Sequence, residues 1–168
     1  MYYFSFNARG EIDMKGDKKI IGILNALLTN ELTAADQYFT HSRMLEDFGY
    51  EKLYERLSHE AEEELQHADV LIKRILFLEG TPDLSKRSGL NIGADVEAMF
   101  KSDLAVEYQV GKDLRDAIKL CEEKQDYQTR HVLMPLLSDT EEDHMYWLEQ
   151  QLGLIERVGL QNYCQSQM

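Results

Sequence analysis

The sequence has few cysteines and no long apolar run. Its two cysteines, Cys121 and Cys164, are far apart and lack CxxC spacing, so neither a disulfide framework nor a thiolate zinc site is indicated. No apolar run approaches the roughly 20 residues needed to cross a bilayer. The amino terminus also lacks the basic start and apolar segment of a signal peptide. These absences predict a cytoplasmic protein without a membrane partner.

Basic residues are scarce as well. The chain has 18 Lys and Arg against 31 Asp and Glu, a formal net charge of -13. This excess of acid argues against binding to nucleic acid or to anionic membrane surfaces, and it leaves cations as the natural ligands. The length of 168 residues corresponds to one domain by the usual prior of about 150 residues per domain.

Helix-breaking residues gather in one interior stretch, where Gly80, Pro82, Gly89 and Gly93 mark a long connection. On both sides of it, apolar residues recur at helical spacing. The spacing predicts long helices over residues 18–48, 51–79, 95–124 and 127–151, with Gly153 separating the last from a short helix near 155–163. We therefore expect an all-α fold, a four-helix bundle with a long crossover between its second and third helices.

The first thirteen residues show no sustained period. We treat residues 1–13 as an N-terminal extension of unassigned structure and residues 14–168 as the domain.

Two copies of one short pattern lie inside the predicted helices. Glu64 with His67, and Glu141 with His144, each place a carboxylate and an imidazole three residues apart. Residues at i and i+3 share one face of an α-helix, so each pair can hold a cation from a single element. One such pair alone is weak evidence, because acids on helices are usually solvated and many Glu/His pairs only form salt bridges.

Two further acids, Glu31 and Glu107, fall on the inward stripes of the other two long helices. A bundle that supplies one Glu from each of two helices and Glu-x-x-His from each of the other two is the known arrangement of ferritin-like di-iron and di-manganese proteins. Burying four unpaired carboxylates would cost several kcal/mol per ion. Two cations would compensate them, and an oxygen-rich set with only two imidazoles favours iron or manganese over zinc.

From Met14 to Met168 the chain resembles the bacterioferritins, the bacterial iron-storage branch of the ferritin-like superfamily. The resemblance rests on short strings spread along the chain: Met14-Lys15-Gly16-Asp17, Asn30-Glu31-Leu32, Asp36-Gln37-Tyr38-Phe39, Gln66-His67-Ala68-Asp69, Arg74-Ile75-Leu76-Phe77-Leu78-Glu79-Gly80, Leu90-Asn91-Ile92-Gly93, Ser102-Asp103-Leu104-Ala105 and Gly159-Leu160-Gln161-Asn162-Tyr163. His144 favours this branch over non-haem bacterial ferritins, which usually lack a second histidine.

The resemblance implies an intrasubunit ferroxidase centre with two irons. Its ligands would be Glu31 and His67 on one iron, Glu107 and His144 on the other, and Glu64 and Glu141 as bridges. The implied activity is oxidation of Fe(II) to Fe(III) by dioxygen or hydrogen peroxide, followed by storage of ferric mineral inside a hollow shell of twenty-four subunits.

The family also suggests roles for residues outside the ligand set. Tyr38 matches a tyrosine that hydrogen-bonds a ligand and can donate an electron, although core packing explains it equally well. His59 and Glu63 match a position that binds iron on the inner cavity wall, and solvation at the surface is the alternative for both. His41 lacks a partner at ligand spacing, so we expect it to be structural.

The largest departure from the family is Leu65, which stands where a methionine from each of two subunits holds haem at a twofold interface. Leucine has no lone pair with which to bind iron. We therefore expect no haem b in a homo-oligomer, with haem available only by co-assembly with a methionine-bearing bacterioferritin subunit. Electron delivery by a ferredoxin-like reductant depends on that haem.

A second departure lies in the fourth helix, where Pro135 and one extra residue between Arg130 and His144 interrupt the family pattern. Proline removes a backbone donor and costs about 3 kcal/mol in a straight helix. A π-bulge near residues 138–140 would restore the inward direction of Glu141 and His144.

Two other classes use the same fold. A rubrerythrin-like di-iron oxidase or peroxidase would share the ligands without storing mineral, but the four-cysteine module of rubrerythrins is missing from this sequence. A structural helical bundle would need no metal. Metal content separates the second class from both enzymes, and the size of the assembly separates the first from a storage shell.

Overall fold

The structure, a computed structural model, describes residues 16–168, so the predicted extension over residues 1–13 lies outside the described part. The described chain is helical and has no strand, which confirms the all-α prediction. Its elements are α1 (Lys18–Asp47), α2 (Glu51–Phe77), α3 (Val96–Glu123), α4 (Tyr127–Asp139), the π-helix η1 (Thr140–Met145), α5 (Tyr146–Val158) and α6 (Leu160–Gln165). Within residues 16–168, no helix has both the length and the apolar character that a membrane span requires.

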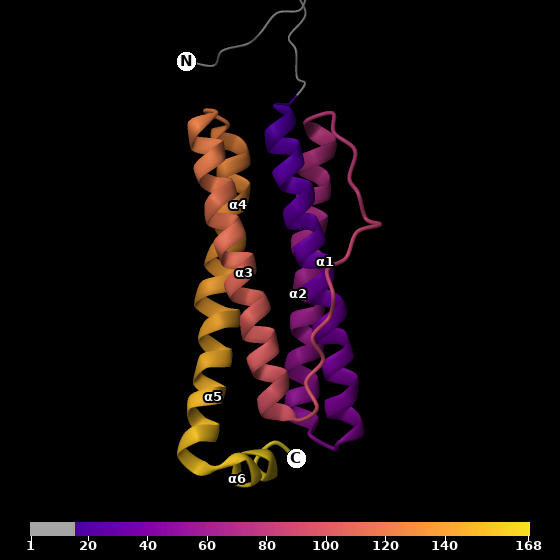
Figure 1. The fold of residues 1–168 in the computed structure, drawn as a ribbon, viewed down its shortest axis with the longest axis vertical. Coiled ribbons are helices and arrows are strands. Elements are labelled where there is room, and N and C mark those ends of the chain that lie inside the picture. The colour runs from indigo at the N-terminus through magenta and orange to yellow at the C-terminus, as the bar shows by residue number, and fades with distance from the viewer. Residues whose placement is uncertain (1–15) are drawn as a thin grey trace, which may run out of the picture.

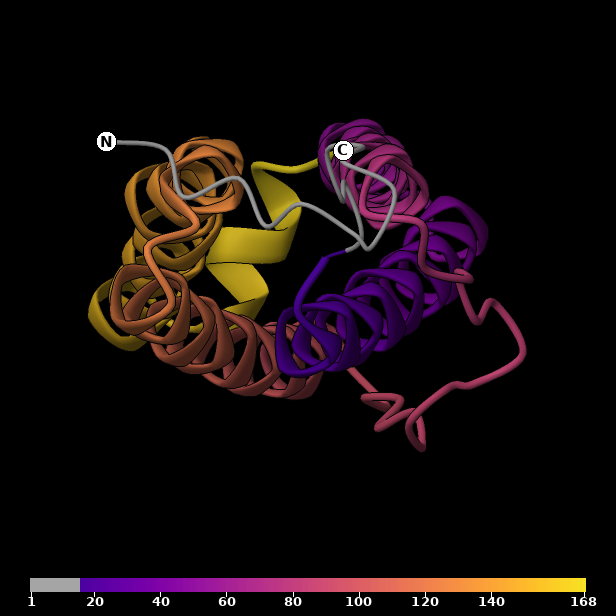
Figure 2. The ribbon, with the colours of Figure 1, turned by 90° about the horizontal axis from the view of Figure 1, so that it is seen from above.

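The long helices form a bundle of two antiparallel hairpins (Figure 1). One hairpin is α1 with α2, and the other is α3 with the continuous rod of α4, η1 and α5. The hairpins meet mainly where α1 packs on α3, and α2 and α4 touch only slightly (Figure 2). Aspartate side chains cap three of the helices by accepting backbone N–H groups of the first turn, namely Asp17, Asp95 and Asp126.

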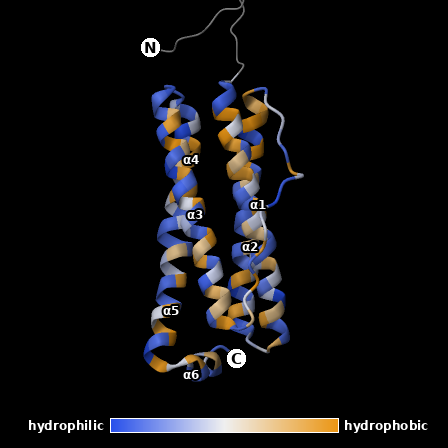
Figure 3. Cartoon of the chain, in the orientation of Figure 1, coloured by the Kyte–Doolittle hydropathy of each residue, from blue (hydrophilic) through white to orange (hydrophobic). Residues whose placement is uncertain are grey.

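Apolar residues recur along each helix among hydrophilic ones (Figure 3). Those that point inward form two separate clusters. One contains Leu24, Leu71 and Leu114, and the other contains Leu57, Phe100 and Leu148. The apolar core therefore consists of two parts, with the middle of the bundle left to other side chains.

The connection between α2 and α3 runs along the outside of α1 (Figure 1). It is the long crossover that was predicted between the second and third helices. Polar side chains of α1 hold it by accepting backbone N–H groups at regular intervals: Asn25 from Asp83 at 2.8 Å, Thr33 from Ser88 at 3.0 Å, Gln37 from Asn91 at 3.0 Å and His41 from Gly93 at 3.1 Å. Nδ1 of His41 also lies 2.9 Å from the carboxylate of Asp103. These contacts give buried His41 a structural role.

The rod formed by α4, η1 and α5 contains the predicted π-turn. Pro135 lies within α4, and η1 begins at Thr140, at the end of the stretch where a bulge was expected. The break that precedes the last helix, however, was misplaced. Gly153 lies inside α5, and the chain turns at Gly159, where φ is +81°, a value that glycine adopts without strain. The short final helix therefore starts at Leu160.

Candidate metal centre

Five of the six predicted ligands meet at the middle of the bundle, between the two apolar clusters. They come from α1, α2, α3 and η1, and each is at least nine-tenths buried: Glu31, Glu64, His67, Glu107 and His144. The helical periodicity that placed apolar residues inward also placed these donors inward.

The donors fall into two groups, each with all its ligand atoms within 4.8 Å of one another. In the first group, Nδ1 of His67 lies 3.4 Å from Glu64 and 3.6 Å from Glu31. In the second, Nδ1 of His144 lies 3.1 Å from Glu64 and 3.4 Å from Glu107. Glu64 belongs to both groups, and the two imidazole rings stack with centroids 6.0 Å apart. A carboxylate shared by two such groups could bridge a pair of cations.

Several buried polar atoms of the centre have no hydrogen-bond partner within residues 16–168. They include both carboxylate oxygens of Glu31, one each of Glu64 and Glu107, and Nδ1 of His67 and of His144. Buried polar atoms are nearly always satisfied in folded proteins, and leaving one unpaired costs about 1–3 kcal/mol. Because all these atoms point into one small volume, bound cations account for them better than packing does.

The structure does not bring Glu141, the sixth predicted ligand, into the centre. Glu141 is partly exposed and forms an ion pair with Arg115. The carboxylate from this part of the rod that reaches a centre histidine is instead Asp139, whose Oδ2 lies 2.9 Å from Nε2 of His67. The Glu-x-x-His prediction assumed α-helical spacing, whereas residues 140–145 form a π-helix.

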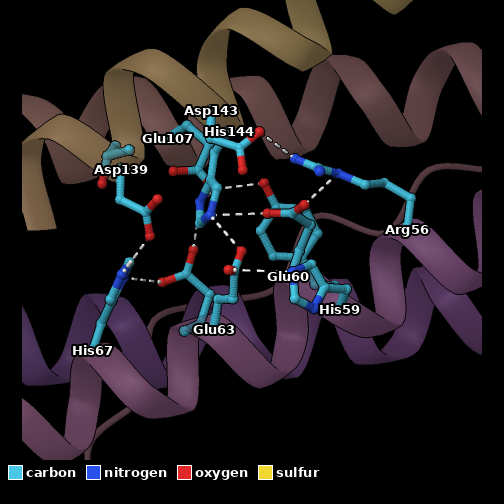
Figure 4. A network of polar contacts seen from close by, with 12 residues as sticks. Arg56, His59, Glu60, Glu63, His67, Glu107, Asp139, Asp143 and His144 are labelled. Atoms are coloured by element: carbon cyan, nitrogen blue, oxygen red, sulfur yellow. Dashed lines mark hydrogen bonds and ion pairs between the residues drawn. The ribbon is translucent and has the colours of Figure 1, made fainter.

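The sequence reasoning also missed a third group on the far side of His144 (Figure 4). Nε2 of His144 lies 2.9 Å from Glu60, which is buried, and 3.4 Å from Glu63. Arg56 forms an ion pair with Glu60 and a 2.6 Å ion pair with Asp143. Glu60 lies four residues before Glu64 on the inward stripe of α2, and this spacing could have indicated from the sequence that Glu60 also points toward the centre.

Comparison with known proteins agrees with this geometry. Residues 21–158 match the family described as the ferritin-like domain. The chain belongs to the ferritin family. A protein named bacterial ferritin from Synechocystis sp. is 56% identical over 155 residues, which cover 92% of this chain and 99% of that protein. The bacterial ferritin of Paramagnetospirillum magnetotacticum is 57% identical over 91% of this chain and 94% of its own length. The bacterioferritin of Mycolicibacterium paratuberculosis is 41% identical over 89% of this chain and 94% of its own length.

The predicted resemblance is therefore confirmed. The structure also gives the surroundings of the three outer residues that the sequence singled out, Tyr38, His59 and Glu63. Tyr38 donates a 2.5 Å hydrogen bond to Glu107, and its ring meets that of His144 edge-on. His59 is exposed and lies 3.2 Å from Glu63.

Burial and neighbouring charges shift the pKa values of several side chains in the site. Burial raises the pKa of Glu31 well above its ordinary value, and the charge of Glu64 raises it further. Burial and the charge of Glu64 also raise the pKa of Glu107 to about 7. Burial opposes charge on His67, but its contacts with Glu31 and Glu64 prevail and raise the pKa of His67 to about 11. In the metal-free protein, His67 is therefore a cation, so a metal ion must displace its proton.

The metal-free protein should become less stable as the pH rises from neutral. The stabilising contribution of His67 is fully present below its unfolded pKa of 6.5 and is lost as the pH rises through the folded value of about 11. A single proton difference gives a slope of about 1.4 kcal/mol per pH unit. Thermal unfolding in a chelator between pH 6 and 10 measures this slope. His144, whose pKa is also raised, despite burial, by neighbouring carboxylates, adds to the same decline. His67→Gln should therefore lower the slope by about one proton's worth, and an equally steep decline in that variant would contradict the assignment.

Proposed function

We propose that this chain is the subunit of an iron-storage protein that oxidises Fe(II) at an intrasubunit di-iron centre and deposits ferric mineral within a hollow shell of twenty-four copies. Iron is both substrate and stored product. The observation that carries the proposal is the position of Glu64, shared by two buried carboxylate and histidine groups in the middle of the bundle. The bacterial ferritin and bacterioferritin relatives support the same function.

The donor set suits the oxidation of iron. Carboxylate oxygens are hard anionic ligands that stabilise Fe(III) more than Fe(II), while the imidazoles of His67 and His144 hold the ions in place. Two ions bound side by side supply two electrons together. Two Fe(II) and two protons convert one dioxygen to hydrogen peroxide, or one hydrogen peroxide to two waters, and leave two Fe(III). The shared carboxylate of Glu64 keeps the two electron donors adjacent.

Charge explains how iron would be drawn to the protein. The net charge of -13 favours approach of cations, and buried Glu31, Glu64 and Glu107 provide the final negative charges. Tyr38 lies within hydrogen-bonding distance of Glu107, so it can orient that ligand or donate an electron to the oxidant. We also propose that exposed His59 with Glu63 binds iron on its way to or from the mineral.

Native mass spectrometry combined with stopped-flow absorbance tests the proposal. A storage shell should have a mass of roughly half a megadalton for subunits of 19.6 kDa and should oxidise two Fe(II) per subunit in a rapid first phase. A small oligomer that oxidises Fe(II) without retaining mineral would indicate the rubrerythrin-like alternative. Protein that takes up no metal from an iron-rich medium would be a structural bundle.

We expect the purified homo-oligomer to contain no stoichiometric haem, because Leu65 stands at the family's methionine position. The side chain of Leu65 is exposed, with 54% of its surface accessible in the single chain, so it is available to a neighbouring subunit. Leu65→Met supplies a thioether and should raise the haem content from near zero toward one per two subunits. Absorbance of protein produced in haem-replete cells measures this, with Leu76→Met, another exposed leucine of α2, as the control. Stoichiometric haem in the unaltered protein would contradict the prediction.

A further inference from the structure

Both histidines of the centre have a carboxylate on the ring nitrogen that faces away from Glu64 (Figure 4). Nε2 of His144 lies 2.9 Å from Glu60, and Nε2 of His67 lies 2.9 Å from Asp139. An ionised carboxylate only accepts hydrogen bonds, so it keeps a proton on Nε2 and leaves the lone pair of Nδ1 for a metal. Metal-binding histidines usually donate their second N–H in this way.

Asp139 reaches His67 because of the π-turn. In an α-helix, Glu141 and His144 would share a face. The i→i+5 hydrogen bonds of a π-helix turn the chain more slowly, so residues three apart no longer align. Thr140, which is buried, occupies the inward position instead, and Glu141 is turned toward Arg115 on α3.

Asp139 lies at the edge of the site, where its side chain is partly accessible to solvent. Asp139 lines an open cavity of about 470 Å³ between α2 and α4, together with His67, Pro135, Glu142 and Asp143. The side chain of Asp139 is 37% accessible, and that of His67 is 10% accessible. Asp139 can therefore be replaced without opening a hole in the apolar core, whereas the His67 ring remains anchored among the buried ligands.

We propose that Asp139 is a positioning residue for His67. It accepts the Nε2 proton of His67 and presents Nδ1 to the metal held with Glu31 and Glu64. The π-turn thus replaces the bridging carboxylate expected from Glu141 with a carboxylate that acts through the histidine. This inference rests on the proposed function, because it concerns the same centre.

Titration of the assembled, metal-free protein with Co(II) tests the proposal, with binding followed by calorimetry and by visible absorption. Asp139→Ala should lower the affinity for one of the two Co(II) ions per subunit by about 10- to 100-fold and change the visible absorption of that ion. Asp139→Asn keeps an oxygen that accepts the Nε2 proton, so it should recover part of the lost affinity. Glu142→Gln removes an exposed acid from the same cavity and should bind Co(II) as the unaltered protein does.

Three results would overturn the assignment of Asp139. Unchanged Co(II) affinity in Asp139→Ala is the first. The second is a loss in Glu141→Gln as large as that in Asp139→Ala, which would return the role to Glu141 as a ligand. The third is Co(II) binding in Asp139→Asn that is no tighter than in Asp139→Ala, which would mean that an oxygen facing Nε2 does not position the ring. If the unaltered protein binds no Co(II), the proposed function itself fails, and that outcome is distinct from these three.

Discussion

Glu64→Gln is expected to abolish the rapid oxidation of Fe(II). Glu64 is the one carboxylate that belongs to both groups of the centre, so its loss weakens both metal positions at once. We expect the initial rate in stopped-flow measurements to fall by more than the roughly 10- to 100-fold typical of losing an outer hydrogen-bond partner. The pKa of Glu64 supports its role. Burial raises it, but the contacts of Glu64 with His144 and His67 outweigh burial and hold the pKa of Glu64 below its ordinary value, so Glu64 is ionised.

The substitution should leave the fold intact. Glutamine has nearly the same shape as glutamate, and the carboxylates of Glu31, Glu60 and Glu107 still face His67 and His144. Glu62→Gln is the matched control, because Glu62 lies two residues away on α2 and is exposed. Its rate should equal that of the unaltered protein. A Glu64→Gln protein that keeps the full rapid phase would show that oxidation takes place elsewhere.

Metal binding is expected to stabilise the protein strongly. A ligand that binds only the folded state at a thousand times its Kd contributes about 4 kcal/mol per site. For a chain of this length, that corresponds to an unfolding temperature about 10 °C higher per site. Calorimetry with and without Zn(II), which has no redox chemistry, measures the shift.

Two variants separate site binding from adventitious binding of zinc. Glu64→Gln should lose most of the shift, because both metal groups use that carboxylate. Glu62→Gln should keep it. An unfolding temperature that does not respond to two equivalents of Zn(II) per subunit would contradict a preformed two-metal centre.

Much of the fold could be predicted from the sequence because long amphipathic helices repeat one simple pattern. The predicted ends of the first three helices lie within two residues of the observed ones, where Asp17, Gly49 and Asp95 supply local cap and turn chemistry. The last break was misplaced because a glycine inside a helix and a glycine that ends one look alike without backbone angles. Gly153 is the first kind, and Gly159 is the second.

The candidate site could be predicted only as far as α-helical spacing holds. Glu31, Glu64, His67 and Glu107 lie on regular α-helices and converge as expected. The extra residue in the fourth rod was recognised, and a π-turn was predicted from it. The periodic rule could not tell which carboxylate the altered winding would turn inward. In the folded rod, Thr140 points inward and Asp139 contacts His67. This outcome depends on side-chain directions that the sequence alone does not give.

The two metal groups differ in how they relate to the halves of the bundle. Glu31, Glu64 and His67 all belong to the α1 and α2 hairpin, whereas the second group joins Glu64 to Glu107 on α3 and His144 on η1. An ion in the first group therefore ties together helices that are already neighbours along the chain. An ion in the second group is a cross-link between the hairpins, so separating them would require giving up that ion, and its occupancy would govern how often the bundle opens.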